Sequence, residues 1–253
     1  MPVNNRVLAW FSCGDASAVA AKLAVDKYGD RCEVLYCDTF AYEHPDNLRF
    51  FADVERWLGR SIIILRSREY KDIYDVFRKT RWLVGPSGCR CTTELKKVPR
   101  MEYQRPDDTH VFGFTMEEQG RVDRFYQQNP ELIVEFPLIE AGYTKNHCHH
   151  IVRDAGIELP AMYRWFDNNN CIGCPKGGKK YWSKIRRLFP EHFAKMAAME
   201  RELDVAICKS EGPGRERIRV FLDELPPDVG QYPEEAPIEC GVLCIPPIQE
   251  SLF

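Results

Sequence analysis

The stretch Arg6-Val-Leu-Ala-Trp-Phe-Ser-Cys-Gly-Asp-Ala-Ser17 decides the fold. It leads from a short apolar run into small and polar residues, and apolar residues at helical spacing follow over Ala16–Tyr28. This order predicts a strand, a tight loop and a helix. Because open parallel sheets bind ligands at the carboxyl ends of their strands, the loop Ser12–Ser17 is the first candidate site.

The same alternation continues along the chain. We predict further strands and helices at Glu33–Asp38, His44–Gly59, Ser61–Leu65, Tyr70–Val84, Thr92–Tyr103, His110–Thr115 and Lys145–Ala155. Strands that alternate with helices pair in parallel, since each crossover helix returns the chain to the same edge of the sheet. We therefore expect an α/β protein with a Rossmann-like parallel sheet flanked by helices.

Three regions are expected along the chain. Residues 1–165 form a nucleotide-binding α/β domain. Residues 166–211 carry a Cys-x-x-Cys loop and one long helix that packs on it, with helical spacing over 184–209. Residues 212–253 are rich in Pro, Glu and Gly, which predicts a flexible C-terminal tail.

Composition narrows the class of protein. The formal net charge of -3 gives no global attraction to polyanions, and no stretch approaches the length of a membrane span. The first residues lack the apolar core of a signal peptide, so we expect a cytoplasmic protein with no membrane partner. Eleven cysteines are many for such a protein, and they favour metal binding or redox chemistry.

The loop Ser12–Ser17 has two interpretations. Backbone N–H groups at the start of a helix can point at a phosphate, Gly14 permits close approach, and the hydroxyls of Ser12 and Ser17 add donors. The alternative is an ordinary helix N-cap, since Ser and Asp are favoured there whatever the function.

Four central cysteines form two close pairs, Cys89-Arg-Cys91 and Cys171-Ile-Gly-Cys174. A turn can aim two thiolates at one metal, and a second pair completes a four-sulfur shell. Structural zinc, an iron–sulfur cluster and redox-active thiols all fit this spacing.

The loop resembles the PP-loop, Ser-Gly-Gly-x-Asp-Ser, of N-type ATP pyrophosphatases and of the phosphoadenylyl-sulfate and adenylyl-sulfate reductases. Ser12, Gly14 and Ser17 match that pattern, whereas Cys13 replaces its first Gly. Asp15 stands where members that cleave ATP often have Lys. The resemblance implies an adenine nucleotide as ligand, and the departures weaken the expectation of ATP cleavage.

Further segments resemble the same family in the same order. Tyr36-Cys-Asp38-Thr39 with Glu43 is similar to its second-strand motif, and Gly113–Arg121 to its Gly-x-Arg-x-x-Glu-x-x-x-Arg segment. Tyr143-Thr-Lys145 and Leu159-Pro-Ala-Met-Tyr163 resemble its Trp-Thr-Lys and Pro-x-x-Tyr stretches. The resemblance implies that the nucleotide is bound by Asp15, Asp38, Thr39, Glu43, Arg121 and Lys145 in addition to the loop.

The resemblance also bears on the cysteines. In adenylyl-sulfate reductases two cysteine pairs surround a [4Fe-4S] cluster, which implies such a cluster on Cys89, Cys91, Cys171 and Cys174, with zinc as the alternative. Glu239-Cys-Gly-Val-Leu-Cys244 resembles the tail segment that carries the nucleophile of these enzymes, with Cys240 in its place. Leu243 stands where the family has His, so Cys240 and Cys244 can instead form a dithiol, or the tail can pack passively.

The first expected function is a sulfonucleotide-reductase-like oxidoreductase. It would bind an adenylylated sulfate, and a thioredoxin-like thiol carrier would resolve the intermediate on Cys240. The alternative is an ATP-dependent sulfur transferase that thiolates tRNA or DNA. A third is a non-catalytic nucleotide-binding module.

Two features stay outside these functions. The residues His147, His149 and His150 point in different directions on a helix, so we interpret them as surface residues. The oligomeric state stays open, a homo-oligomer included.

Overall fold

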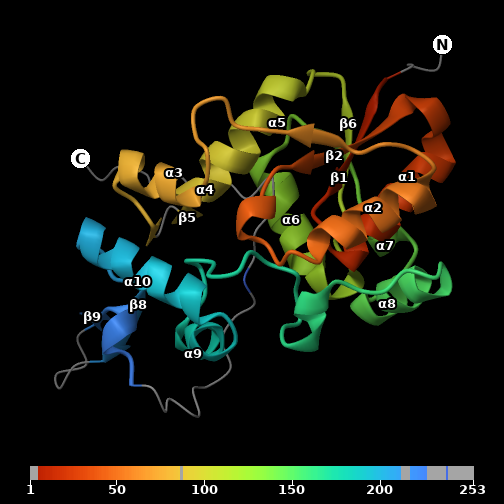
Figure 1. Cartoon of the computed structure of the whole chain (residues 1–253). Helices are drawn as coiled ribbons and strands as arrows, with labels where there is room; N and C mark the ends of the chain where they lie inside the picture. Colours follow the sequence, from red (N-terminus) through yellow and green to blue (C-terminus); the bar gives the residue numbers. More distant parts are fainter. Residues whose placement is uncertain (1–4, 86–87, 212–216, 227–237, 239–253) are drawn as a thin grey trace. The chain divides into compact units, whose positions relative to one another are not determined.

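A computed structural model describes residues 5–85, 88–211, 217–226 and 238 of the chain. Within them, five parallel strands form one sheet in the order β3-β2-β1-β6-β7. The strands are β1 (Val7–Phe11), β2 (Cys32–Cys37), β3 (Ile63–Leu65), β6 (Thr109–Val111) and β7 (Ile133–Glu135). Helices flank this sheet, and the prediction of a Rossmann-like α/β fold is confirmed (Figure 1).

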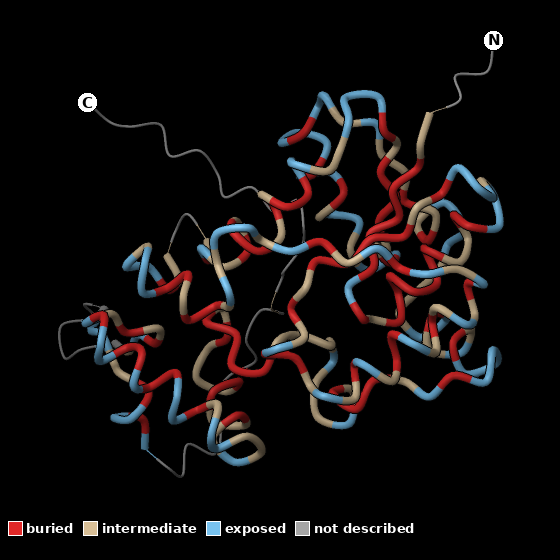
Figure 2. Tube along the Cα trace, turned by 45° about the horizontal axis from the view of Figure 1, so that its top comes forward, coloured by how far each residue is buried: buried red, intermediate tan, exposed pale blue. Residues whose placement is uncertain are grey.

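The central strand β1 is buried along its whole length (Figure 2). Its apolar run, with no polar side chain, is typical of a strand that is covered on both faces. Val7, Ala9 and Phe11 point into one hydrophobic core, while Trp10 points to the other face and contacts His110 of β6. The sheet is therefore the middle layer of three.

The helices between the strands are α1 (Asp15–Tyr28), α2 (Asn47–Leu58), α5 (Val98–Tyr103) and α6 (Gln119–Gln128), and α7 (Pro137–Glu140) and α8 (Lys145–Asp154) follow the last strand of this sheet. Local signals set their ends. Gly59 ends α2 with φ 66°, a conformation that costs glycine little. Thr144 begins α8, and its side chain accepts a hydrogen bond from the backbone N–H of His147.

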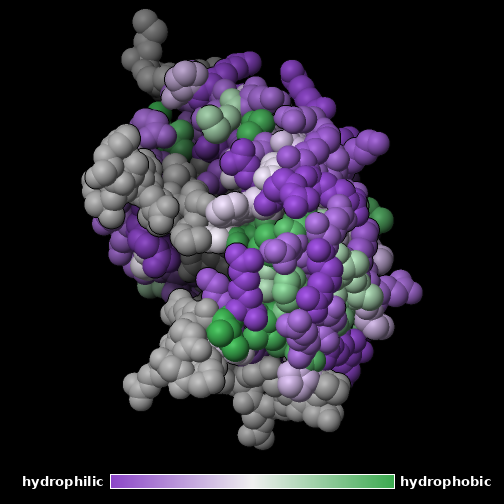
Figure 3. All heavy atoms as spheres, turned by 90° about the vertical axis from the view of Figure 1, so that its left-hand side faces the viewer, coloured by the Kyte–Doolittle hydropathy of each residue, from purple (hydrophilic) through white to green (hydrophobic). Residues whose placement is uncertain are grey.

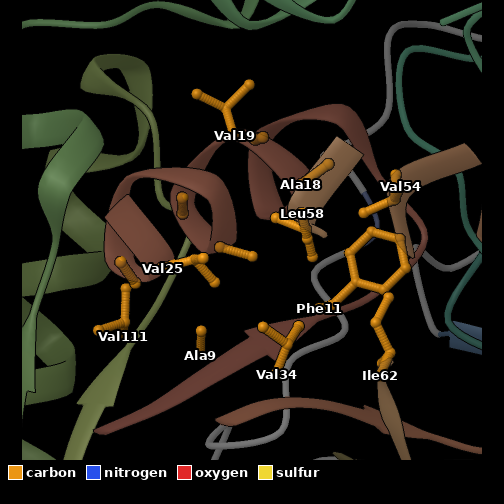
Figure 4. Close-up of a cluster of buried hydrophobic side chains, with 14 of the residues drawn as sticks. Ala9, Phe11, Ala18, Val19, Val25, Val34, Val54, Leu58, Ile62 and Val111 are labelled. Carbon is orange, nitrogen blue, oxygen red and sulfur yellow. The ribbon is translucent and has the colours of Figure 1, made fainter. Parts of the chain in front are cut away.

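The larger core lies between the sheet and helices α1 and α2. Figure 4 shows Val25 of α1 on the side of the helix that faces Ala9, whereas Val19 lies on the side that faces away from the strands. The many alanines of α1 let the helix approach the sheet closely, because their side chains end at Cβ. This packing fixes the start of α1, where the candidate loop lies.

The chain divides into two compact units. The first contains the sheet and comprises residues up to 40, 44–66 and 98–169. The second comprises residues 41–43 and 67–97 together with the chain from residue 170 onward. The segment 67–97 thus belongs with the C-terminal part of the chain.

The second unit is mainly helical. Its elements are α3 (Ile73–Thr80), β4 (Val84–Gly85), β5 (Gly88–Cys89), α4 (Arg90–Thr92), a π-helical turn (Thr93–Lys97), α9 (Lys179–Leu188), α10 (Pro190–Leu203), β8 (Cys208–Glu211) and β9 (Arg217–Val220). The view in Figure 3 shows a mostly hydrophilic face with a smaller group of apolar side chains. Such a mixture is normal, since folded proteins always keep some apolar atoms at the surface.

The single long helix predicted over 184–209 is wrong. The structure has two helices there, because Pro190 lacks the N–H that a continuous helix needs and instead begins α10. The apolar spacing on both sides of Pro190 is helical, so the pattern by itself concealed the break.

The predicted flexible tail also needs a correction at residues 217–226. Within them, β9 pairs antiparallel with β8, and Leu222 in the following turn is fully buried. Leu222 and Leu225 are both buried, the backbone N–H of Leu222 donates to Glu200 of α10, and Arg201 of α10 forms an ion pair with Asp223. None of the described helices is both long and apolar enough to cross a membrane.

Candidate functional site

The candidate loop lies at the point where the order of the strands in the sheet reverses. From β1 the chain moves to β2 on one side, whereas β6 pairs with the other side of β1. The connections that follow β1 and β6 therefore diverge, and ligands of open α/β sheets bind in the space that opens there. The loop Ser12–Gly14 and the first turn of α1 occupy this position.

The backbone of the loop bends sharply at Cys13. Its φ of 56° is left-handed, a conformation that costs most residues about 1 kcal/mol and glycine little. The resembled motif has Gly at this place. Asn169 stabilises the bend, since its Nδ2 donates a hydrogen bond to the Cys13 carbonyl oxygen over 2.6 Å.

The two serines of the loop bind each other. The hydroxyl of Ser17 donates to the carbonyl oxygen of Gly14 over 2.9 Å and accepts from the backbone N–H of Ser12 over 3.1 Å. The Ser12 hydroxyl donates to Ser17 as well and is exposed. Ser17 is therefore a residue that shapes the loop, while Ser12 is the hydroxyl that a ligand can reach.

Gly113 brings the end of β6 against the start of α1. A Cβ atom at this position would lie 2.6 Å from the carbonyl oxygen of Ala16 and 2.7 Å from Cα of Ser17. Both are backbone atoms that cannot move aside cheaply. Only glycine allows this approach, in which the backbone of Gly113 packs directly on the first turn of α1.

Asp15 is the most unusual residue of the loop. It is the first residue of α1, and it is buried with 0% exposure. Lys145 at the start of α8 places its Nζ 2.5 Å from Asp15 Oδ1, and Tyr163 donates its hydroxyl to the same oxygen. Helices α1 and α8 pack against each other, which brings these residues together (Figure 1).

Tyr163 closes this cluster over the loop. Its hydroxyl oxygen accepts hydrogen bonds from the backbone N–H of Asp15 over 3.3 Å and from Lys145 Nζ over 3.0 Å. Burial and the neighbouring Asp15 carboxylate raise the pKa of Tyr163 well above its ordinary value. The phenol therefore stays protonated, and it occupies an N–H group that a bound phosphate would use.

His149 completes the surroundings of Asp15. Its Nε2 lies 3.2 Å from Asp15 Oδ2, although the geometry is not that of a hydrogen bond. Burial lowers the pKa of His149, and the Asp15 carboxylate opposes that change. The interpretation of His149 as a surface residue is thus wrong. Its position four residues after Lys145, on the same face of α8, was the signal in the sequence.

Asp38 and Thr39 lie at the end of the neighbouring strand β2. The Asp38 carboxylate accepts a hydrogen bond from Arg66 Nε over 2.8 Å. Thr39 is buried, and its hydroxyl lies 3.1 Å from the hydroxyl of Tyr36. In the structure, Thr39 therefore helps to hold the strand end, and Asp38 is the more accessible of the two.

Arg121, predicted to bind the nucleotide, has other partners. It lies on α6, forms an ion pair with Glu118, and its guanidinium carbon lies 4.4 Å from the centre of the Phe114 ring. Glu118 also accepts a hydrogen bond from the backbone N–H of Thr115. These contacts hold Arg121 beside the connection that follows β6.

The four central cysteines all belong to the second unit, as does Glu43, which is buried. The sulfur atoms of Cys89 and Cys91 lie 3.1 Å apart, and the Cys89 thiol donates to the carbonyl oxygen of Leu83 over 3.0 Å. The buried phenol of Tyr42 lies near Cys171 and Cys91, and burial together with these two thiols raises the pKa of Tyr42. One residue of each pair is thus close to the same side chain.

Tyr181 holds the Cys-x-x-Cys turn in shape. Its hydroxyl donates to the carbonyl oxygen of Cys171 over 2.9 Å and accepts from the backbone N–H of Cys174 over 3.0 Å. Gly173 between them has φ 74°, which favours glycine.

Four thiols are suitable ligands for zinc or an iron–sulfur cluster. In the part of the chain that the structure describes, however, no three His, Cys, Asp or Glu side chains converge as metal ligands. Within that part, Tyr42 is the side chain that lies near one cysteine of each pair.

The predicted site residues therefore fall into four groups. The first unit brings Ser12, Gly14, Asp15, Ser17 and Lys145 together, and Tyr163 and His149 join them. A second group is Asp38, Thr39 and Arg121, whose contacts with Arg66, Tyr36 and Glu118 lie outside the loop Ser12–Ser17, together with Glu43 of the second unit. The cysteine pairs form a third group. Cys240 and Cys244 lie outside the described residues.

Comparison with known proteins adds no family to this description: no protein-family model matches the chain, and no curated protein matches it either.

Proposed function

We propose that the loop Ser12–Ser17 binds the anionic part of an adenine nucleotide, and that the protein is a sulfonucleotide-reductase-like enzyme of the cytosol. The contact of Lys145 with Asp15 at the start of α1 carries this proposal. The amino end of a helix favours an anion, but a carboxylate beside it opposes one. The ammonium of Lys145 offsets that carboxylate, so the position keeps its preference for a phosphate or sulfate.

Tyr163 sets a condition for binding. Because its hydroxyl accepts the backbone N–H of Asp15, an anion that uses this N–H must displace the phenol. The displaced Tyr163 would still reach Lys145 or the ligand. We therefore expect Tyr163→Phe to change the affinity for nucleotide, while Tyr126→Phe, at an exposed tyrosine of α6, serves as the matched control.

The proposed reaction needs a thiolate that attacks sulfur. The thiolate of Cys240 would form an S–S bond with the sulfur of an adenylylated sulfate, and the adenosine phosphate would leave with the electron pair of the broken S–O bond. A dithiol carrier of the thioredoxin type would then reduce that S–S bond. Sulfite would be released, and the carrier would become a disulfide.

The alternative, an ATP-dependent sulfur transferase acting on tRNA or DNA, gains support from the same contact. Members of the resembled family that cleave ATP often carry a Lys where this loop has Asp15. Lys145 reaches the loop from α8, so an amine is present although its place in the sequence differs.

Product analysis separates these functions. Sulfite released from an adenylylated sulfate would support the reductase, whereas AMP and pyrophosphate from ATP would support the transferase. Cys240→Ser should abolish sulfite release, and Cys208→Ser, at a buried cysteine of β8, should not. Nucleotide binding without either product would favour a non-catalytic module and overturn the proposed reaction.

A metal on Cys89, Cys91, Cys171 and Cys174 forms a second, independent part of the proposal. Iron and zinc are measured after anaerobic purification, together with the ultraviolet–visible spectrum. About four iron atoms per chain would support a [4Fe-4S] cluster, by the composition of that cofactor. A colourless protein that contains neither metal would refute this part.

A further inference from the structure

Arg100 is a buried arginine with incomplete hydrogen bonding. It lies on α5 with 6% exposure, and its Nε and Nη1 have no hydrogen-bond partner among the residues that the structure describes. A buried guanidinium normally has a carboxylate or several carbonyl groups around it, because an uncompensated buried charge is costly. The N–H groups of Nε and Nη1 are therefore available to a ligand that accepts hydrogen bonds.

His110 offers a second donor. Burial lowers the pKa of its ring, and Arg100 lies close enough for the guanidinium charge to lower that pKa further. His110 is fully buried in β6, and Trp10 Nε1 donates a hydrogen bond to its Nδ1 over 3.0 Å. Because Nδ1 is the acceptor, the proton of the neutral ring must be on Nε2. That Nε2 is buried and has no partner among the described residues. The rings of Trp10 and Phe112 lie nearly parallel to that of His110, and the hydrogen bond from Trp10 fixes the direction of the His110 ring.

Gln104 adds a third polar group. It follows Arg100 by one helical turn, and its backbone N–H donates to the Arg100 carbonyl oxygen over 2.9 Å. The buried Oε1 of Gln104 has no partner among the described residues. Because the oxygen and nitrogen of an amide are assigned from their surroundings, rotation of this amide would present its NH₂ group instead.

Among the described residues, no carboxylate forms an ion pair with Arg100, and Glu131 is the acidic side chain whose charge acts on it. Burial lowers the pKa of Arg100 to about 10, which still leaves it protonated at neutral pH. Asp108 is taken by Arg6, at 3.0 and 2.7 Å, and by the backbone N–H of Arg105. Glu131 is exposed to water, and the remaining group near Arg100 is the thiol of Cys37.

We propose that Arg100, His110 and Gln104 form a binding site for one small monovalent inorganic anion of the chloride type. A single guanidinium is balanced by a single negative charge, and the three side chains supply N–H donors around it. The site lies on the face of the sheet opposite α1, because Trp10 and His110 alternate with the residues that pack on that helix. It is therefore distinct from the candidate loop.

Bromide is a suitable probe, since it resembles chloride and scatters X-rays anomalously. Thermal unfolding is measured in sodium gluconate and during replacement of gluconate by bromide at constant ionic strength. We expect the midpoint of the wild-type protein to rise and saturate, because an anion that binds only the folded state stabilises it. Arg100→Met should lose the response, and Arg56→Met, at an exposed arginine of α2, should keep it.

The same substitution makes a prediction in gluconate. Without a bound anion, Arg100→Met removes an uncompensated buried charge, so it should unfold at a temperature equal to or higher than that of the wild type. An equal bromide response in wild type and Arg100→Met would overturn the proposal.

Crystals of the wild-type protein grown with bromide provide a test that needs no variant. An anomalous peak within hydrogen-bond distance of the Arg100 guanidinium and His110 Nε2 would support the site. Ordered water there, with no anomalous signal, would refute it.

Discussion

Replacing Lys145 by Met tests the centre of the candidate site. Methionine keeps much of the length and volume of the lysine stem but removes its charge. The Asp15 carboxylate, which is fully buried, would then lack its ammonium partner and keep only the hydroxyl of Tyr163 and the ring of His149.

The expected loss follows from the burial of the two partners. Removing one member of a buried ion pair costs about 3 to 5 kcal/mol. The side chain of Lys145 is 30% exposed, so water already weakens this pair, and the lower limit of about 3 kcal/mol applies. For a chain of this length that corresponds to a fall of roughly 6 to 12 °C in the unfolding midpoint.

Lys22→Met is the matched control. Lys22 forms an ion pair with Asp26 on the exposed surface of α1, with exposed fractions of 28% and 55%. An exposed pair of this kind contributes only about 0.3 to 0.5 kcal/mol. The free energies of unfolding of both variants and of wild type are measured by urea titration.

A second variant separates the charge from the packing. Asp15→Asn together with Lys145→Met removes both charges, so the double variant should recover a large part of the lost stability. If Lys145→Met unfolds within about 0.5 kcal/mol of Lys22→Met, the uncertainty expected for independent sites, the pair does not hold the loop and the reasoning fails.

Three further predictions concern single residues. Gly113→Ala should lower stability by about 3 kcal/mol or more, because its Cβ would overlap α1, whereas Gly120→Ala, with open space around it, should be neutral or stabilising; equal values would contradict the close approach. Burial lowers the pKa of His110 to about 4, below its ordinary 6.5, so the unfolded chain takes up the proton first. The contribution of His110 to stability should be constant above about pH 6.5 and should fall by up to about 3 kcal/mol towards pH 4. If urea titrations give His110→Gln the same pH dependence of stability as the wild type, His110 is excluded as the cause. Burial raises the pKa of Cys32 to about 11 and of Cys148 to about 12, so mass spectrometry should find both unalkylated by iodoacetamide at pH 8 unless the protein is unfolded.

The sheet could be predicted because its strands are short apolar runs that end in small or polar residues. Val7–Phe11 and Cys32–Cys37 follow the predicted bounds within a residue. The division of the predicted long helix at Pro190 was missed because the apolar spacing continues through the break. Periodicity reports which face is buried, whereas a proline changes the direction of the axis without altering that periodicity.

The candidate site was harder to predict, because its contacts join distant segments. Ser12, Gly14 and Ser17 are adjacent in the sequence, and a loop motif identifies them. The contact between Asp15 and Lys145 spans 130 residues and depends on how α8 packs on α1. Arg100 shows the same limit. A sequence reveals an arginine on a helix, but only the fold shows that its Nε and Nη1 are buried without a hydrogen-bond partner among the described residues.

The charges of Asp15 and Lys145 are best considered together, because the ammonium of Lys145 neutralises the carboxylate of Asp15. Taken separately, an acidic residue in a phosphate loop argues against anion binding, and a lysine on a distant helix carries no information. Taken together, they leave the start of α1 with nearly the balance of charge that an uncharged loop would have, since the two side chains neutralise each other. This arrangement differs from a loop that carries its own lysine, because the amine comes from α8. Any ligand that draws Lys145 away from Asp15 must therefore compensate a buried carboxylate, which favours ligands that leave the pair intact and bind through the backbone N–H groups and Ser12.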